Sequence, residues 1–371
     1  MENRLDWIDT LRLLAGVSMI GLHATADANG QPWPGYEQAD RIVPILLRSI
    51  LYIARTELFI IISVFLLFLA LDKRSRSYKT VLQQQSSRLI LPFVFWTIFF
   101  SFYGLFKAYN FGYFDYAVAQ LTSPKYWFDA FILGTSKYHM HFIPTLFGVL
   151  LLFPIYRVAI DHPEVGFAIV ALLLVKQQLD TFIYSQFWDT DILPFLVRAN
   201  KILTYAGYGL FAASCYGIVK KGIKETRKWL PVLLLSGLLL YLLKLTATWK
   251  TIENGVYPYS YVAGYWADFL MPCALFLGCM LLGNSVSSKT ISNFAKYSFG
   301  LYLCHPIFLD IAEVALQLQS LLPIVQIALK LCFALPLTFA FVWTLSQSHL
   351  LGWTVGLKPL PYRPRQKAQV L

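Results

Sequence analysis

The chain has 371 residues, of which 57% are hydrophobic and only 14% are charged, and its formal net charge is +11. A soluble protein of this length needs a larger polar shell than this composition supplies. The basic residues lie in short connectors between long apolar runs, which indicates membrane topology and argues against nucleic acid as a partner. The composition therefore predicts an integral membrane protein surrounded by the lipid bilayer.

Ten membrane-spanning helices are predicted from the apolar runs, covering residues 8–26, 44–71, 89–109, 141–160, 165–184, 200–219, 229–248, 261–282, 292–314 and 322–345. The predicted fold class is all-α, a polytopic membrane helix bundle. We expect a transmembrane domain over residues 1–346 and a short basic cytosolic tail over residues 347–371. Residues 1–12 are acidic on balance, so the first run is expected to be a retained helix and not a cleaved signal peptide.

The orientation follows from the connectors. Lys and Arg are concentrated in the connectors 72–88 and 220–228 and in the tail, whereas the alternate connectors are sparse in both. The positive-inside rule therefore places both termini in the cytosol. The opposite connector 110–140 is long and rich in aromatic residues, which suits an interfacial helix, a re-entrant segment or a lid.

The first predicted helix carries two polar residues that hydrocarbon does not tolerate without a partner or a function, Arg12 and His23. Eleven residues correspond to three turns plus about 20°, so both lie on one face, about 16 Å apart along the axis. Either Arg12 reaches the lipid phosphates and His23 bonds a neighbouring helix, or the two belong to a functional polar lining. We favour the second interpretation for the pair.

Three further histidines fall at compatible depths. His139 and His141 open the fourth predicted helix at its outer end, and His305 lies about midway along the ninth, so these groups are placed to converge with His23. Neither HxxxH nor HExxH occurs on one helix, and the five cysteines form no CxxC pair. We therefore expect no metal.

Acidic residues also occur within the predicted helices. Arg55 and Glu57 would point about 200° apart on one helix, so each is expected to find its partner on another helix. Asp268 lies about ten ångströms deep in the eighth predicted helix, which makes it a candidate functional residue. Asp310 and Glu313 are expected to be solvated at the outer surface.

The basic residues at the cytosolic side include Arg74 and Arg76 in the connector 72–88. They are explained either by topology or by an anionic cofactor that docks at the inner mouth of the bundle. Arg88 lies at the inner start of the third predicted helix, close to the expected position of Arg12.

Several short motifs occur in order along the chain. Asp9-x-Leu11-Arg12 opens the first helix, and ten residues separate Arg12 from His23. The second helix contains ELFIIIS, with Glu57 at its start and Ser63 at its end. Later motifs are Arg88 and Pro92 at the start of the third helix, with Gln85 at the upstream position, the stretch His139–Pro144, and the set Ser298, Tyr302, Leu303 and His305.

With these motifs the chain resembles the acyltransferase-3 family of integral membrane acyltransferases, over residues 6 to about 310. The family has arginine where this chain has Gln85, a tryptophan where it has His141, and a glycine where it has Val64. The resemblance implies transfer of an acyl group, usually acetyl, from cytosolic acetyl-CoA to a hydroxyl group of an extracytoplasmic polysaccharide or lipid-linked glycan. It also implies a bacterial inner-membrane location.

The resemblance, together with the depth and charge of the polar residues, suggests roles for individual residues. His23 would act as general base or as a transient acyl carrier, and Arg12 would bind coenzyme A or fix the reactive geometry. Arg88, Arg74 and Arg76 would assist in binding the cofactor. Supporting or substrate-binding roles fall to Glu57, Ser63, His139, His141, Tyr302, His305 and Asp268. The alternative is a proton-coupled membrane transporter that uses the buried Arg, His, Glu and Asp residues as a relay.

Overall fold

The computed structural model describes residues 5–257, 263–286, 288–316 and 318–361, and these are almost entirely helical, with no strand among them. The first half of the described chain forms α1 (Asp6–Ala24), α2 (Gln38–Leu51), α3 (Thr56–Lys73), α4 (Tyr78–Gln85), α5 (Leu91–Asn110), α6 (Phe114–Leu121), α7 (Pro124–Leu133), α8 (Phe142–Leu151), α9 (Phe153–Tyr156) and α10 (Val158–Asp161). The second half forms α11 (Ala168–Phe187), α12 (Leu193–Thr204), α13 (Ala206–Lys221), α14 (Leu230–Asn254), α15 (Ala263–Leu282), α16 (Lys289–Ala295), α17 (Ser298–Ala315) and α18 (Pro323–Gln347).

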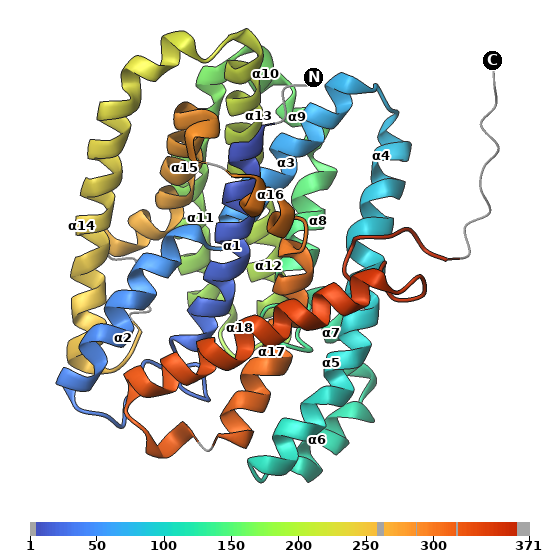
Figure 1. The fold of residues 1–371 in the computed structure, drawn as a ribbon, viewed down its shortest axis with the longest axis vertical. Coiled ribbons are helices and arrows are strands. Elements are labelled where there is room, and N and C mark those ends of the chain that lie inside the picture. Colours follow the sequence, from blue (N-terminus) through green and yellow to red (C-terminus); the bar gives the residue numbers. More distant parts are fainter. Residues whose placement is uncertain (1–4, 258–262, 287, 317, 362–371) are drawn as a thin grey trace.

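The helices form an all-α polytopic membrane bundle. Eight helical segments of the described chain are long and apolar enough to cross a membrane, and α8 with the helix after it, bent by 59°, makes a ninth. The apolar run of α1 is interrupted by Asp9, Arg12 and His23, and α1 is not among these segments. It nevertheless runs through the middle of the bundle with most of its residues buried (Figure 1). The described residues thus supply eight or nine candidate crossings, and α1 is the helix that the sequence-based count of ten adds to them.

The second predicted helix is interrupted near its middle. A 3₁₀ turn (Tyr52–Ala54) follows α2, and Arg55 then adopts an extended conformation before α3 begins. The long outer connector 110–140 contains the short helices α6 and α7. The turn at Tyr52–Ala54 depends on local geometry that an apolar pattern does not encode, whereas a helix was one of the arrangements expected for the connector 110–140.

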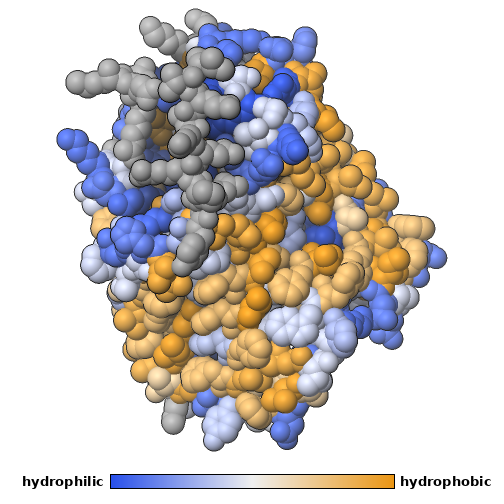
Figure 2. Space-filling model, turned by 90° about the vertical axis from the view of Figure 1, so that its right-hand side faces the viewer, coloured by the Kyte–Doolittle hydropathy of each residue, from blue (hydrophilic) through white to orange (hydrophobic). Residues whose placement is uncertain are grey.

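The basic connectors lie on one face of the bundle. Lys220 at the end of α13 pairs with Asp72 at the end of α3 across 2.8 Å. The same face holds the start of α1, because the Thr10 hydroxyl donates to the carbonyl oxygen of Val286, just after α15. By the positive-inside rule we take this face as cytosolic. Figure 2 shows a broad hydrophobic band on one side of the molecule, with hydrophilic side chains gathered towards its ends.

The core near the cytosolic end of α1 is built from aromatic rings. Trp7 is 1% exposed and packs edge-on against Phe65 of α3 and Phe276 of α15, with ring centroids 5.6 and 5.3 Å away. The segment after α18 packs on the bundle as well. Its Thr354 carbonyl accepts a hydrogen bond from the Trp96 indole of α5, and Val355 is buried. The expected tail therefore starts with residues that belong to the folded bundle.

One close helix contact gives a direct test of this packing. An added Cβ at Gly217 in α13 would lie 2.2 Å from the carbonyl oxygen of Ile160 in α10, a backbone atom that cannot turn away. We expect Gly217→Ala to lower the free energy of unfolding by about 1–3 kcal/mol. A Cβ added at Gly237 in α14 would meet no atom within 4 Å, so Gly237→Ala should be neutral or slightly stabilising. Thermal unfolding in detergent measures both, and a Gly217→Ala protein that melts with the wild type would contradict the packing.

Candidate active site

Three histidines from distant parts of the sequence meet in the bundle. The ring of His23, at the end of α1, stacks on His305 of α17 with centroids 5.3 Å apart, and His139 lies 5.3 Å from His305. Tyr138 packs on His23 at 4.2 Å, and Tyr302 lies 5.2 Å from His139. We call these five residues the histidine cluster.

Close helix packing brings the histidine cluster together. A Cβ at Gly16 in α1 would lie 3.3 Å from the Cβ of Ser298, the first residue of α17, so a small residue lets these two helices approach. Tyr302 fixes the neighbouring connector, because its hydroxyl group donates a hydrogen bond to the carbonyl oxygen of His139. Tyr302 is therefore engaged in positioning His139.

A proline in α17 determines how His305 is held. Pro306 has no backbone N–H, so the carbonyl of Tyr302 lacks its ordinary helical partner. The Nδ1 atom of His305 lies 2.8 Å from that carbonyl oxygen. A carbonyl oxygen only accepts, so Nδ1 carries the proton and Nε2 carries the lone pair. The missing backbone N–H of Pro306 thus frees the carbonyl that sets the tautomer of His305.

His139 is held through its other ring nitrogen, Nε2. Its Nε2 lies 3.2 Å from the carbonyl oxygen of Leu303 and donates to it, which leaves the lone pair on Nδ1. His139 lies in the connector between α7 and α8, where burial lowers its pKa well below the usual range of histidine. Among the described residues, Nδ1 of His139, Nε2 of His305 and Nε2 of His23 have no hydrogen-bond partner. These buried nitrogens are available to a bound molecule.

The cluster is open on one side. Tyr138 remains 44% exposed although its ring packs on His23, and His23 itself is half-buried, whereas His139 and His305 are 2% and 0% exposed. His23 and Tyr138 therefore form the partly exposed edge of the cluster, although Nε2 of His23 is itself buried, and the other two histidines lie behind them.

Buried ion pairs surround the outer side of the cluster and overturn one expectation from the sequence. Asp310 and Glu313 are not solvated at the surface: they are 2% and 7% exposed. Lys137 lies 2.5 Å from Asp310, Lys107 lies 2.8 Å from Glu313, and Lys330 lies 2.8 Å from Glu313. These lysines come from three other segments, and together they neutralise both carboxylates inside the protein.

These ion pairs also fasten the segments that carry the cluster. Lys137 directly precedes Tyr138 and His139 in the chain, so its pair with Asp310 ties that connector to α17. Lys107 and Lys330 further donate to the carbonyl oxygens of Ala28 and Ala26, in the segment that follows His23. One network thus holds all three histidine-bearing segments.

His141 lies beside the cluster but makes no ring contact with it in the described part of the chain. Arg198 of α12 donates to the His141 carbonyl oxygen at 2.5 Å and to the Leu133 carbonyl oxygen at 2.7 Å. Gly134 adopts a positive φ of 73° there, and a Cβ on it would lie 2.7 Å from the His141 backbone. Arg198 and Gly134, neither of which the sequence singled out, therefore shape the end of this connector.

Arg55 and Glu57 pair with each other, contrary to the expectation that each would find another helix. Arg55 Nε lies 2.6 Å from Glu57, which is fully buried and also accepts a hydrogen bond of 2.5 Å from the Tyr205 hydroxyl. The prediction was wrong because Arg55 precedes α3 in an extended conformation, so helical angles do not apply to it. Ser63 lies farther along α3 and is half-buried.

The arginines expected to bind a cofactor lie at the cytosolic end. Arg12 pairs with Asp9 at 3.2 Å and lies within electrostatic range of Arg88. Arg88 belongs to a π-helical turn (Ser86–Ile90), a local geometry that is frequent at functional sites. Arg74 is exposed at the end of α3, and Arg76 donates to Gln84 at 2.6 Å. A cavity of about 790 Å³ lies along α4 and this turn.

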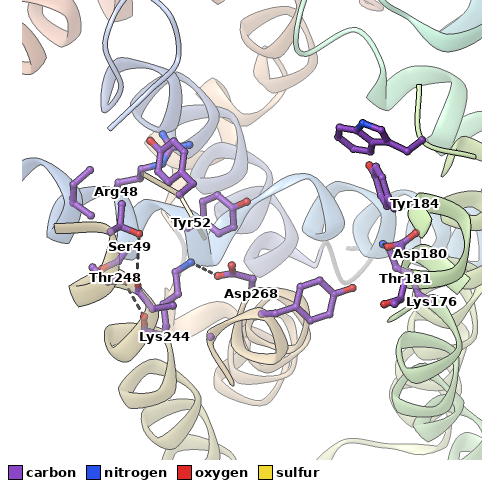
Figure 3. Close-up of a pocket in the computed structure, with 17 residues that line it drawn as sticks. Arg48, Ser49, Tyr52, Lys176, Asp180, Thr181, Tyr184, Lys244, Thr248 and Asp268 are labelled. Atoms are coloured by element: carbon purple, nitrogen blue, oxygen red, sulfur yellow. Dashed lines mark hydrogen bonds and ion pairs between the residues drawn. The ribbon is translucent and has the colours of Figure 1, made fainter. Parts of the chain in front are cut away.

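A second cavity, of about 1140 Å³, lies between α2, α11, α14 and α15 (Figure 3). Asp268 lines it and pairs with Lys244 at 2.5 Å. In the described part of the chain, no group of three or more His, Cys, Asp or Glu residues is arranged to hold a metal ion.

Fold and site together define a multi-pass integral membrane protein with a buried group of acid–base side chains. Residues 5–346 match the sequence model of a family described as an acyltransferase domain, so the chain belongs to the acyltransferase-3 family and is a membrane acyltransferase. The resemblance seen in the motifs is thereby confirmed, and the transporter interpretation gains no support. Comparison with curated proteins and with solved structures gives no match.

The ion-pair network yields a prediction about stability. Asp310→Asn leaves Lys137 inside the protein with a neutral partner, and breaking a buried pair from one side costs about 3–5 kcal/mol. We expect a correspondingly lower melting temperature in detergent. Asp191→Asn removes the partner of Lys125 from an exposed pair and should leave the melting temperature unchanged. Equal melting temperatures for the two variants would show that the network does not hold the bundle.

Proposed function

We propose that the protein transfers an acetyl group from cytosolic acetyl-CoA to a hydroxyl group of an extracytoplasmic polysaccharide or lipid-linked glycan, in a bacterial inner membrane. Family membership establishes that the protein transfers an acyl group. The identity of the donor and of the acceptor is what we propose in addition. The observation that supports it best is the histidine cluster, which holds buried basic nitrogens without a hydrogen-bond partner, among them Nε2 of His23. A hydroxyl acceptor needs such a base.

The cytosolic end of the same helix suits the donor. Coenzyme A carries phosphates, which arginine binds by charge-assisted hydrogen bonds. Arg12 and Arg88 lie near each other there, and Arg74 and Arg76 add positive charge at the adjoining surface. In this proposal the nucleotide part binds at these arginines, and the pantetheine arm brings the thioester along α1 towards His23.

In the proposed reaction His23 acts as the general base. Its imidazole takes the proton of the acceptor hydroxyl as the oxygen attacks the thioester carbonyl, forming the new C–O bond. The C–S bond breaks, and the proton passes from His23 to the departing sulfur, so the products are the acetyl ester and free coenzyme A thiol. His139 and His305 form the wall behind His23, with Tyr302 holding His139 in place. The second route, with His23 as a transient acyl carrier, uses the same contacts.

Replacing His23 tests the proposed chemistry. His23→Ala should lower kcat by roughly a hundredfold to ten-thousandfold, the usual contribution of a general base. The measurement is release of coenzyme A thiol from acetyl-CoA in the presence of isolated cell-envelope glycan, together with the mass of the surface glycans in cells. His162→Ala, at an exposed histidine paired with Glu164, is the control and should keep full activity. A folded His23→Ala protein with near-normal turnover would refute the assignment.

Arg88 offers a separate test of the donor site. Arg88→Gln should raise KM for acetyl-CoA by roughly tenfold to a hundredfold with little change in kcat, because a charged hydrogen bond contributes about 1.5–3 kcal/mol. Arg157→Gln removes an exposed arginine that follows α9 and should leave KM unchanged. An unchanged KM for acetyl-CoA in Arg88→Gln would place the coenzyme elsewhere. The same assay tests the transporter alternative, because a permease would consume no acetyl-CoA.

A further inference from the structure

The cavity of about 1140 Å³ has no assigned role in the chemistry above, although it is large enough for several sugar rings. Five aromatic side chains line it: Tyr52, Tyr184, Trp188, Tyr257 and Tyr265. Figure 3 shows labelled residues of α11 facing those of α2, α14 and α15 across the open space. Aromatic rings exposed to such a space offer apolar faces with polar edges, the surface that a sugar ring requires.

The cavity lies in the half of the bundle away from the basic connectors. α14 begins at Leu230, directly after one of these connectors, and its lining residues start at Lys244. Fourteen residues of helix correspond to about 21 Å of rise, so the lining lies well beyond the bilayer centre as seen from the cytosol. On the opposite wall, Trp188 follows the outer end of α11 and is 72% exposed. The cavity is thus on the side from which an extracytoplasmic acceptor arrives.

The charges that line the cavity are not balanced. Lys244 pairs with Asp268, and Lys176 pairs with Asp180, so these two lysines are neutralised. Arg48 is different, because it pairs with no carboxylate among the described residues. Its guanidinium carbon lies 4.9 Å from the centre of the Tyr257 ring. A positive charge flanked by aromatic rings is therefore available to an anion.

Arg48 also connects this cavity with the histidine cluster. Its Nη1 donates to the carbonyl oxygen of Leu22, the residue before His23, and lies 3.4 Å from the carbonyl oxygen of Thr25. The guanidinium thus sits at the carboxyl end of α1, where the helix dipole favours a cation. An anion bound to Arg48 would be held next to the backbone that carries His23.

We infer that this cavity binds the acceptor and that the acceptor is an acidic sugar, whose carboxylate or phosphate pairs with Arg48 while its rings stack on the aromatic side chains. This inference rests on the proposed function, since it names the acceptor of the same reaction. A lipid acyl chain fits the lining poorly, because it would leave two ion pairs and Arg48 without water. A cationic solute would be repelled by Arg48.

Binding without acetyl-CoA tests the inference, because no turnover occurs. Calorimetry of the purified wild-type protein should show that an oligosaccharide containing glucuronic acid binds at least tenfold tighter than its neutral glucose counterpart. A hexose 1-phosphate, compared with the free hexose, distinguishes a phosphate from a carboxylate as the preferred anion. A preference for either acidic sugar supports the inference. Equal binding of acidic and neutral sugars, or equally tight binding of inorganic phosphate alone, would overturn it.

Three variants test whether Arg48 is the anion-binding residue. Arg48→Gln should abolish the preference for the acidic sugar, whereas Arg48→Lys, which keeps the charge, should retain most of it. Tyr184→Leu should weaken acidic and neutral sugars alike, because it removes a stacking surface and no charge. If Arg48→Gln fails to fold, Arg48→Met, which removes the charge and keeps the aliphatic stem, takes its place. A preference for the acidic sugar that survives in a folded variant without the Arg48 charge would place the anion site elsewhere.

The outcome is separable from that of the proposed function. His23→Ala should bind the acidic sugar as the wild type does, since His23 acts in turnover. If turnover depends on His23 but binding shows no preference for acid, only the acceptor inference fails. If binding shows the preference but turnover is independent of His23, the proposed catalytic role fails and the cavity assignment stands.

Discussion

The requirement that every charge inside a membrane bundle be neutralised or hydrogen-bonded determines how this protein is built. Lys137, Lys107 and Lys330 reach Asp310 and Glu313 from three different segments, and the first two contacts join residues 173 and 206 positions apart in the sequence. In water such pairs would contribute little. Inside the bundle the cost of leaving either partner alone makes the geometry obligatory, and this geometry brings the histidines together.

The same constraint explains why the histidines differ from the charged pairs. A histidine can remain neutral, so it needs only one donor–acceptor contact to be held, and the second nitrogen is left for a reactant. His305 and His139 each use a backbone carbonyl for that contact. For His305 the carbonyl is released by Pro306, which means that the dipeptide His-Pro encodes both the residue and the means of orienting it.

Much of the fold was accessible from the sequence, because ten apolar runs and the distribution of Lys and Arg report directly on membrane crossing. The details that failed depend on short-range breaks and on long-range partners. The segment 44–71 is apolar enough as a whole to be taken for one helix, which conceals the turn at Tyr52–Ala54 that lets Arg55 pair with Glu57. Lys137 looked like an ordinary connector residue, since nothing local reveals that Asp310 faces it across the bundle.

The arrangement also explains why the apolar run of α1 is interrupted by polar residues. A reaction between a cytosolic donor and an extracytoplasmic acceptor needs one element that meets both, and in the proposed mechanism α1 carries Arg12 at one end and His23 near the other. Its polar residues are tolerated only because neighbouring helices enclose them, as the central position of α1 in Figure 1 illustrates. Arg48 of α2 lies at the carboxyl end of α1, where it satisfies terminal carbonyls and also places a positive charge beside His23, the general base of the proposed mechanism.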